Sequence, residues 1–583
     1  MDRMLRCILA GLALAGAAAA QTFPAGFVRE RIGGTFADAI ALCWIDETRL
    51  LVAERIGRLW YVEDDVARNL VYDLSGETSP QHNRGLFGLA VAPDFDVSGW
   101  IYVLHSLRLP GEPSSAPTYG RLIRVRAQFE PSGELVARPE TREILLGDSW
   151  ATGIPSCVDD HTLGSVRFLS DGSLVLSTGD NSTAGFNPGG QEPACFLPGR
   201  VSLDQDLGSF RSQYLDSLNG KVLRIDPETG LGLADNPFFT GNPADLRSRV
   251  YARGLRNPFR FTVLPGTGPR EALMIADVGW NTWEELDLCL GGENFGWPCF
   301  EGAGPAPQYP AADTHGFCAA AEPTAPLLAW HHSQAGASFV GQCASALCVY
   351  RGERYPPFYR GRLFFFDFER GWLRAAELGP DLTLQSTTLF SPRINAPVEL
   401  VAQPGTGDLV YISQGTSATS VFRIRYVGNQ TPPIAVASAT PSFGPGDLDV
   451  VLSAEGSHDP DGQPLDYSWD LGDGSSATGP LVAHHYPAGS AFVARLTVVD
   501  AEGLAASAEV RITPGNTPPR ILAVVAPRDG DIYVDGEPLR MLARVTDAEE
   551  ATPAASWALD LVHGHHVHPD LDRKSTRLNS SHT

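Results

Sequence analysis

The sequence predicts an all-β protein, and three observations support this class. Glycine and proline are frequent, with 60 and 45 residues among 583, and both residue types mark turns. Between residues 27 and 426, an apolar strand, a Gly- or Asp-rich turn and a second apolar strand recur. No comparably long amphipathic helical pattern interrupts these pairs. Short strands joined by turns therefore dominate the prediction.

The repeated strand pairs predict a β-propeller. In the clearest pair, apolar residues alternate with polar ones across 166–168 and again across 174–176, as a half-buried strand requires. Ser170-Asp171-Gly172 predicts the hairpin turn between them, because glycine adopts positive φ freely. Since four-stranded sheets repeated around an axis form a propeller, we predict six blades within residues 21–428. The other five pairs lie at 50–62, 88–104, 259–277, 361–373 and 398–412.

Two proline pairs divide the remainder of the chain. Asn429-Gln-Thr-Pro-Pro ends the repeats, because a proline pair cannot join a central strand. Residues 429–515 then show short alternating strands, with Trp469 and Tyr486 as core residues, and predict an immunoglobulin-like β-sandwich. Asn516-Thr-Pro-Pro begins a truncated β fragment at 516–571. Residues 572–583 resemble a translated sequencing adapter, so we exclude them from the fold.

The N-terminus and the net charge indicate an exported protein. Residues 1–20 have the features of a signal peptide: Arg3 and Arg6, an apolar run, and an alanine-rich cleavage site. No other run is apolar enough to span a bilayer, so no membrane span is expected. The formal charge of -24 argues against nucleic acid and anionic membranes as partners. We therefore expect a secreted or periplasmic protein.

Cysteine usage agrees with export. Removal of the signal peptide leaves an even number of cysteines, which favours disulfides in an oxidising compartment. Cys343 and Cys348 flank a short predicted loop and are expected to pair. Further expected pairs are Cys157 with Cys195 and Cys299 with Cys318. The absence of a C-x-x-C pair argues against structural zinc.

Asp160-His161 is the candidate reactive element. His161 follows two carboxylates and precedes the strand at 166–168, so it lies in a loop at one end of a sheet. An imidazole titrates near neutral pH, and the carboxylate of Asp160 can stabilise the imidazolium. His161 is therefore our candidate general base. A hydrogen-bonded loop histidine without catalytic function is the simpler alternative.

Motifs between residues 30 and 425 resemble the glucose/sorbosone dehydrogenase family, the soluble aldose dehydrogenases that use pyrroloquinoline quinone (PQQ). The resemblance implies a six-bladed propeller with the quinone on its axis. It also implies oxidation of the C1 hydroxyl of aldose sugars to the lactone, with calcium and an external electron acceptor. The motifs are Gly85-Leu-Phe-Gly-Leu-Ala-Val-Ala-Pro-Asp-Phe, Asp160-His161 through Gly179-Asp180, Asn219-Gly-Lys-Val-Leu-Arg-Ile-Asp, Gly254-Leu-Arg-Asn-Pro-Phe and Gly292-Glu-Asn-Phe-Gly-Trp-Pro.

Site residues follow from this resemblance by position. His161 is similar to the family's catalytic histidine, and Asp160 to its acidic neighbour. Arg256 and Asn257 resemble an Arg-Asn pair that contacts the quinone, where a guanidinium stabilises charge on the quinone oxygens. Asn83 stands at the position of a family glutamine before the Gly-Leu-Phe-Gly block. The resemblance thus implies a site assembled from three separate segments.

Calcium and the anchoring cations complete the implied site. Gly279 and Trp280 fall where family members offer backbone carbonyls to calcium, a hard cation that prefers oxygen ligands. The chain departs from the family where cations hold the quinone carboxylates. Glu369 replaces a lysine, and Ala396-Pro397-Val398 replaces an Arg-x-Arg pair. Candidate substitutes are Arg84, Arg370 and Arg393.

In the second predicted domain, Trp469-Asp-Leu-Gly-Asp-Gly resembles the WDFGDG signature of the PKD domain. This implies a spacer, or a module that contacts polysaccharide or a surface protein.

Two other interpretations of the propeller stay open. One is a non-catalytic propeller-PKD protein that binds glycan or protein at the cell surface, with a degenerate PQQ site. The other is a metal-dependent hydrolase in which His161 and nearby acids hold a metal. A cationic axial pocket on which His161 and Arg256 converge favours the dehydrogenase. Three or more side chains around one metal favour the hydrolase.

Overall fold

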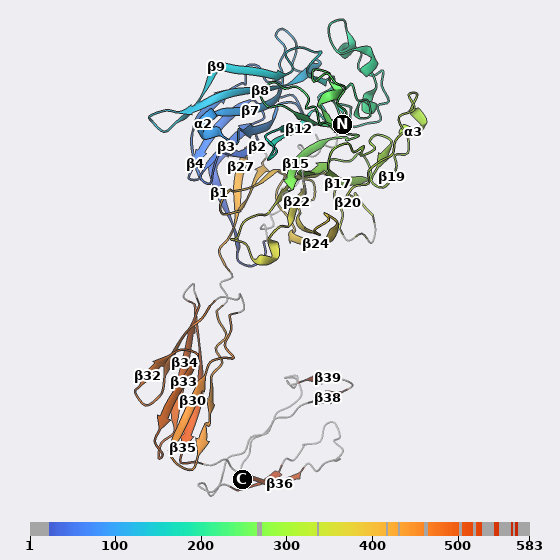
Figure 1. Ribbon diagram of the computed structural model, residues 1–583. Helices are drawn as coiled ribbons and strands as arrows, with labels where there is room; N and C mark the ends of the chain where they lie inside the picture. Colours follow the sequence, from blue (N-terminus) through green and yellow to red (C-terminus); the bar gives the residue numbers. More distant parts are fainter. Residues whose placement is uncertain are drawn as a thin grey trace. The chain divides into compact units, whose positions relative to one another are not determined.

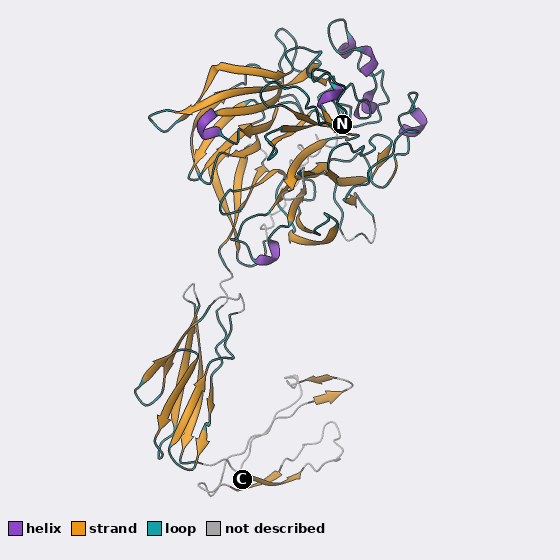
Figure 2. Ribbon diagram, viewed as in Figure 1, coloured by secondary structure: helices purple, strands orange, loops and turns teal. Residues whose placement is uncertain are grey.

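The computed structural model describes residues 23–264, 271–334, 337, 339–415, 418–428, 432–459, 464–500 and 504–516, and the backbone of four later strands. Contacts divide the chain into two compact units, residues 1–427 and 428–583. Strands dominate both units, and the two α-helices among the described residues, α2 (Phe95–Ser98) and α3 (Tyr309–Ala312), have four residues each (Figure 2). The predicted all-β class is confirmed. The predicted signal peptide and the tail at 572–583 lie outside the described residues. Within the described part, no helix is both long and apolar enough to cross a bilayer.

In the first unit, six antiparallel sheets of four or five strands follow one another along the chain (Figure 1). Each of the six predicted strand pairs falls in a different sheet, and Gly172 has the predicted positive φ, 85°. The first sheet contains β2 (Ala39–Trp44), β3 (Arg49–Glu54), β4 (Arg58–Glu63) and β5 (Val66–Asp73), and the second contains β6 (Leu86–Val91), β7 (Trp100–Ser106), β8 (Thr118–Phe129), β9 (Leu135–Leu146) and β10 (Ile154–Ser156). The third sheet contains β11 (Leu163–Phe168), β12 (Leu174–Thr178), β13 (Lys221–Ile225) and β14 (Val250–Arg253), and the fourth contains β15 (Pro258–Leu264), β16 (Ala272–Asp277), β17 (Trp283–Cys289) and β20 (Leu328–His331). The fifth sheet contains β21 (Ala344–Val349), β22 (Leu363–Asp367), β23 (Leu373–Leu378) and β24 (Leu384–Ser391), and the sixth contains β25 (Pro397–Ala402), β26 (Leu409–Gln414), β27 (Thr419–Tyr426) and β1 (Phe27–Phe36).

The first strands of these sheets contact one another in chain order. β6 lies between β2 and β11, β15 lies between β11 and β21, and β25 contacts both β21 and β2. The strand β1, from the start of the described chain, pairs with β27 of the last sheet. The segments just before the first strands, including those of His161 and Arg256, are therefore expected at the same end of the strands. Within the described strands each sheet is separate, and the count of six blades stays a prediction.

The apolar runs explain why these strands are buried on both faces. In β22, Phe364, Phe365 and Phe366 are all at most 1% exposed, because neighbouring sheets cover both sides of the strand. The aromatic rings of Trp330, Phe365 and Trp372 pack at centroid distances of 5.4 to 5.6 Å. Such packing between sheets holds the strand ends, and therefore the loops that carry polar residues, in fixed positions.

The second unit contains the predicted β-sandwich. Trp469 and Tyr486 are buried in its core, and each donates a hydrogen bond to a backbone carbonyl, of Gly479 at 3.1 Å and of Leu471 at 2.9 Å. One sheet contains β28 (Ser438–Thr440), β30 (Leu448–Ser453) and β33 (Leu481–Tyr486); the other contains β29 (Phe443–Gly444), β31 (Asp466–Asp470), β32 (Ser476–Thr478), β34 (Phe492–Val499) and β35 (Ala505–Pro514). Of the fragment at 516–571, the structure describes two strand pairs, β36 (Arg520–Ala526) with β37 (Leu542–Thr546) and β38 (Leu561–His563) with β39 (His566–His568).

Two of the three expected disulfides form. Cys157 pairs with Cys195, and Cys299 pairs with Cys318. The expected Cys343–Cys348 pair is wrong, because neither residue is in a disulfide and the segment between them is β21, not a loop. Five positions along a strand separate two Cα atoms by about 16 Å, whereas a disulfide requires less than about 7 Å.

Candidate active site

His161 lies in the loop between β10 and β11, and the surrounding chain fixes this loop. His161 has a φ of 45°, and its side chain is buried. The side chain of Asn181 donates hydrogen bonds to the carbonyls of Val158 and Asp160 at 2.8 and 2.9 Å. Gly179 passes so close that a Cβ there would lie 2.3 Å from the His161 carbonyl oxygen. The site thus depends on a glycine next to the histidine loop.

The imidazole of His161 pairs with Asp180. Its Nδ1 lies 2.8 Å from Oδ1 of Asp180, a fully buried carboxylate. Trp297 Nε1 donates to the other carboxylate oxygen at 2.8 Å, and the backbone N–H of Ser182 donates to Oδ1 at 2.9 Å. Burial raises the pKa of the Asp180 carboxyl, but His161, Arg256 and Trp297 together hold it below its ordinary value. Asp180 is therefore an ionised acceptor that holds the imidazole.

Asp160, the predicted partner of His161, points elsewhere. Its Oδ1 accepts a hydrogen bond from Asn83 Nδ2 at 2.8 Å, so the structure brings together Asn83 and Asp160. The carboxylate on His161 instead comes from the end of β12, which pairs with β11 so that Leu163 faces Thr178. Sequence reasoning included Gly179-Asp180 in a motif but gave Asp180 no role. The predicted hairpin of β11 and β12 could have indicated this pairing, because the start of β11 and the end of β12 lie side by side in an antiparallel pair.

Arg256 and Asn257 lie beside Asp180, immediately before β15. The carboxylate of Asp277 accepts hydrogen bonds from their backbone N–H groups at 2.9 and 2.6 Å. The guanidinium of Arg256 lies over the ring of Trp297, at 5.5 Å from its centroid, and the Arg256 carbonyl accepts from the backbone N–H of Asp180 at 2.8 Å. His161 and Arg256, 95 positions apart in the sequence, thus both adjoin Asp180, and Trp297 contacts both Asp180 and Arg256.

Gly279 and Trp280 belong to a turn that a buried carboxylate organises. Oε1 of Glu301 accepts hydrogen bonds from the backbone N–H groups of residues 280–283 at 2.8 to 3.2 Å. The carbonyl of Gly279 accepts from Arg256 Nη1 at 2.8 Å. A carbonyl oxygen has two lone pairs, so one remains for a cation. Within the described residues, no group of three or more His, Cys, Asp or Glu side chains could hold a metal. The hydrolase interpretation therefore has no support there.

The cations that could hold a tricarboxylate quinone differ in availability. Arg84 is fully buried, and its guanidinium donates to Ser156 and to the carbonyls of Ser114 and Ala116 at 2.7 to 3.2 Å, so it is committed to the protein. Arg370 and Arg393 are exposed. They lie before β23 and β25, and the loops that carry them are joined by a hydrogen bond from Ile394 N–H to the Gly371 carbonyl. Arg370 and Arg393 are thus available to replace the family's cations, whereas Arg84 is not.

The small cavity next to the histidine loop is mainly apolar and does not itself form the cationic axial pocket that would favour the dehydrogenase. The cavity there holds only about 20 Å³, about one water molecule, and apolar side chains line most of it. Its one lining cation, Arg55, pairs with Asp38 at 2.7 Å and donates to the Pro80 carbonyl at 2.6 Å. The apolar residues come from the first strands, Ile40, Phe87, Phe259 and Val398, and from Phe368. A planar cofactor would therefore lie at the strand ends beside His161 and Arg256, above this packing.

Asn83 also lines this small cavity, and it provides a fit test for a ligand. Its Oδ1 is buried and has no hydrogen-bond partner among the described residues. Arg256 and the exposed Arg370 and Arg393 offer donors to an anionic group at the strand ends, whereas this orphaned acceptor requires a hydrogen-bond donor or a cation on the ligand.

Comparison with known proteins places these observations in context. Residues 36–420 match the family described as Glucose / Sorbosone dehydrogenase, and residues 430–514 match the family described as PKD domain. HIPL1 protein of Arabidopsis thaliana is 28% identical over 48% of this chain and 38% of its own length. Quinoprotein glucose dehydrogenase B of Acinetobacter calcoaceticus is 25% identical over 44% of this chain and 49% of its own. The chain thus spans less than half the length of these two relatives.

A solved structure of a glucose dehydrogenase has a TM-score of 0.50 at 20% identity, over 68% of this chain and 98% of that one. At this identity the likeness indicates a shared fold.

Proposed function

Because the chain belongs to the glucose/sorbosone dehydrogenase family, we propose that it is an exported oxidoreductase that oxidises the C1 hydroxyl of aldose sugars to the lactone. The observation that supports this best is the convergence of His161 and Arg256 on Asp180 at one end of the first strands. We further infer that the six sheets are the blades of one propeller, because the first strands adjoin one another in chain order and β25 returns to β2.

His161 acts as the general base. Its Nδ1 faces the ionised Asp180, so Nδ1 carries the proton and Nε2 keeps the lone pair that accepts the proton of the C1 hydroxyl. Asp180 then stabilises the imidazolium that forms, while Trp297 and Ser182 keep its carboxylate in place. Asp160 has an indirect role, because it holds Asn83.

Arg256 stabilises negative charge on the electron acceptor. Its guanidinium is held by the carbonyls of Val278 and Gly279 at 3.0 and 2.8 Å, and this fixed orientation costs no rearrangement during the reaction. PQQ, when bound, supplies the acceptor for the hydride that leaves C1. Arg256, Asn257 and Asn83 would contact it, and Arg370 and Arg393 would hold its carboxylates.

Calcium would bind jointly with the quinone. The carbonyls of Gly279 and Trp280 offer too few ligands for a cation that takes six to eight oxygens, so quinone oxygens and water must supply the rest. Calcium alone is therefore expected to bind weakly, and PQQ should tighten its binding.

The test is dye reduction by the purified chain with PQQ, calcium and a panel of aldoses. Activity that requires PQQ and is lost in His161→Ala supports the proposal. Absence of PQQ binding at micromolar concentration, with or without calcium, would overturn it.

A non-catalytic glycan- or protein-binding role is the second candidate. It is favoured by Glu369 at the lysine position, by the commitment of Arg84 to backbone carbonyls, and by the apolar packing next to the histidine loop. On this alternative the chain binds sugars or a surface protein without oxidising sugars, and the PKD domain serves as a spacer or a second contact. Sugar binding without PQQ binding would favour it.

A further inference from the structure

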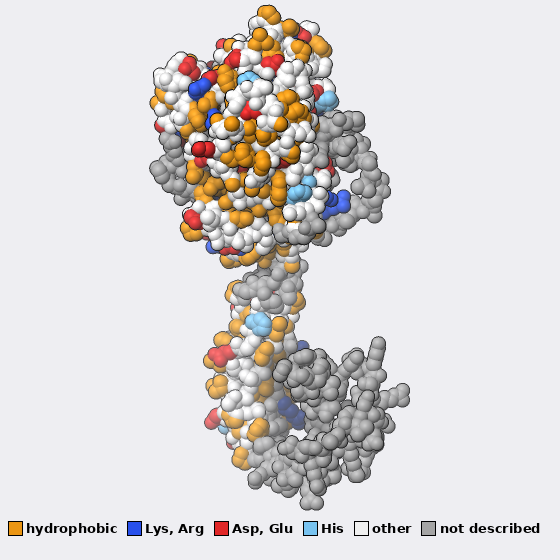
Figure 3. Space-filling view, turned by 90° about the vertical axis from the view of Figure 1, so that its right-hand side faces the viewer, with side chains coloured by type: hydrophobic (Ala, Val, Ile, Leu, Met, Phe, Trp, Pro, Cys, Tyr) orange, Lys and Arg blue, Asp and Glu red, His pale blue; other side chains and the backbone are white. Residues whose placement is uncertain are grey.

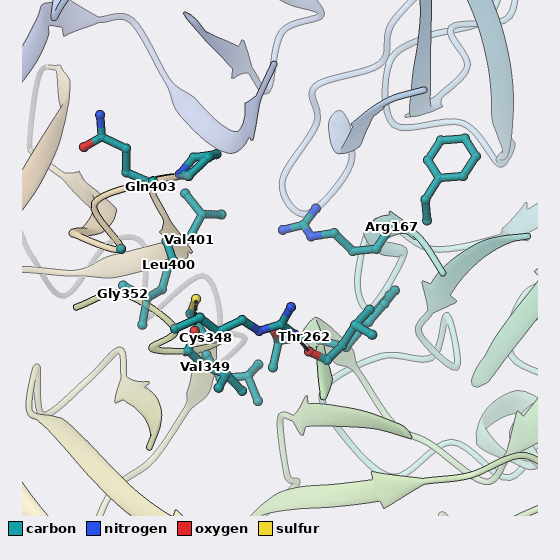
Figure 4. A pocket seen from close by; sticks show the side chains of 17 residues that line it. Arg167, Thr262, Cys348, Val349, Gly352, Leu400, Val401 and Gln403 are labelled. Atoms are coloured by element: carbon teal, nitrogen blue, oxygen red, sulfur yellow. Dashed lines mark hydrogen bonds between the residues drawn. The ribbon is translucent and has the colours of Figure 1, made fainter. Parts of the chain in front are cut away.

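A second cavity, of about 350 Å³, opens at the other ends of the same first strands (Figure 4). β11 and β15 begin next to the segments of His161 and Arg256, and their later residues, Phe168 and Val263, line this cavity. β11 has six residues and β15 has seven, and a rise of about 3.3 Å per residue puts the two ends roughly 15–20 Å apart. The cavity is therefore separate from the candidate active site.

Buried charges close the axis between the two ends. Arg260, on β15, donates to the carbonyl of Ile40 on β2 at 2.6 Å, and its Nε lies 3.0 Å from Oε2 of Glu399 on β25. Arg167, on β11, approaches the other oxygen of Glu399 at 3.4 Å. Arg260 and Glu399 are almost fully buried. One carboxylate therefore serves two guanidinium groups, and this leaves a positive charge in excess at the floor of the cavity.

The walls combine guanidinium groups with apolar surface. Figure 4 shows the side chain of Arg167 reaching towards the open space. Arg351, an exposed residue on the rim, donates to the Val263 carbonyl at 2.7 Å through one nitrogen only. Most of the remaining lining is apolar and includes Leu347, Leu400 and Val401. Glu47 also lies at the rim, with its carboxylate next to Gly405. Among these named groups, Arg167, Arg260 and Arg351 outnumber Glu399 and Glu47.

We propose that this cavity is a binding site for a small organic carboxylate with an apolar body. Its volume lies within the usual range of small-molecule sites, which are mostly apolar with a few placed polar groups. The planar guanidinium matches a carboxylate through paired hydrogen bonds. An excess of positive charge in a recess is unusual in a chain of net charge -24, and basic side chains are few on the face shown in Figure 3.

Binding of benzoate to the full chain tests the site, with benzamide as a neutral probe of the same shape. We expect a Kd of about 1 mM or tighter for benzoate by calorimetry or ligand-observed NMR, and at least roughly tenfold weaker binding of benzamide. Arg351→Gln should weaken benzoate binding by roughly 10- to 100-fold, because a charge-assisted hydrogen bond is lost. Val401→Phe, which fills the cavity without changing its charge, should weaken both probes. Arg511→Gln, at an exposed position of the second unit, is the matched control and should bind benzoate as the wild type does.

The proposal would be overturned by equal binding of benzoate and benzamide, by wild-type binding by Arg351→Gln, or by no benzoate binding at about 20 mM. Inorganic phosphate that competes as well as benzoate would also overturn the organic-carboxylate assignment and indicate a simple anion site. Because Arg351 is exposed, its variant is expected to fold, and a thermal melt checks this. None of these readouts depends on PQQ or on sugar oxidation, so the result is independent of the proposed function.

Discussion

Replacing Asp180 with Asn tests whether the buried carboxylate, and not its neighbour Asp160, supports His161. Asp180→Asn keeps the size of the side chain but removes the charge 2.8 Å from the imidazole Nδ1. A hydrogen bond to a charged group contributes about 1.5–3 kcal/mol, so the rate constant for sugar oxidation should fall roughly 10- to 100-fold.

Asp160→Asn is the matched variant, because it removes the other carboxylate, the one next to His161 in the sequence, and Asn83 holds that carboxylate. Its Oδ1 accepts from Asn83, and an amide oxygen can accept the same hydrogen bond. The assay is steady-state dye reduction with PQQ and an aldose, with thermal melts to verify folding. A smaller loss in Asp160→Asn than in Asp180→Asn is expected. A larger loss in Asp160→Asn, or a wild-type rate in Asp180→Asn, would refute the reasoning.

Three further predictions concern stability. Burial, followed by the charges of Asp277, Glu301 and Glu284, raises the pKa of Glu285 to about 8, so the folded chain keeps a proton that the unfolded chain releases above about pH 4. The free energy of unfolding should therefore fall between about pH 4 and about pH 8, by up to about 1.4 kcal/mol per pH unit. In urea titrations at several pH values, Glu285→Gln should make this fall smaller. An unchanged dependence on pH in Glu285→Gln contradicts the assignment. Glu301→Ala leaves the backbone N–H groups of residues 280–283 without their acceptor, so the free energy of unfolding in urea should fall by about 3 kcal/mol. An unchanged urea midpoint would mean that the turn does not need the Glu301 carboxylate. The double variant Cys157→Ser/Cys195→Ser removes a disulfide that joins residues with a sequence separation of 38, so the free energy of unfolding should fall by about 4 kcal/mol. The urea midpoint of the double variant is compared with that of the wild type, with and without reductant. Identical midpoints would exclude a stabilising role of the disulfide.

The strand pairs were predictable because their signal is local. The alternation around 166–176 and the glycine at 172 specify a hairpin without reference to the rest of the chain, and β11 and β12 confirm it. The Trp469 and Tyr486 core was predictable for the same reason, since alternation separates the buried face from the exposed one. Cys343 and Cys348 show the limit of this approach. Their spacing looked like a loop, whereas pairing with β22 makes the segment a strand.

The contacts of the candidate site depend on tertiary structure. His161 could be identified from its loop and its neighbours, but side chains of adjacent residues diverge, so adjacency could not identify its carboxylate partner. The partner Asp180 is supplied by the pairing of β11 with β12, and Trp297 and Arg256 reach it from other sheets and loops. The alternation of apolar and polar residues along a strand also does not show which side chains pack between the first strands of the six sheets. The apolar packing near Phe87 and Phe259 and the Arg260–Glu399 pair were therefore not expected from the sequence.

The central claim is that His161 accepts the proton of the sugar hydroxyl during oxidation. A single-turnover experiment tests it most directly, because it separates cofactor binding from chemistry: the protein is loaded with PQQ and calcium, mixed with glucose, and the absorbance change of the quinone is followed. The wild type should reduce the quinone, and His161→Ala should bind PQQ equally well but reduce it at least roughly 100-fold more slowly. Equal reduction rates in the two proteins would contradict the account.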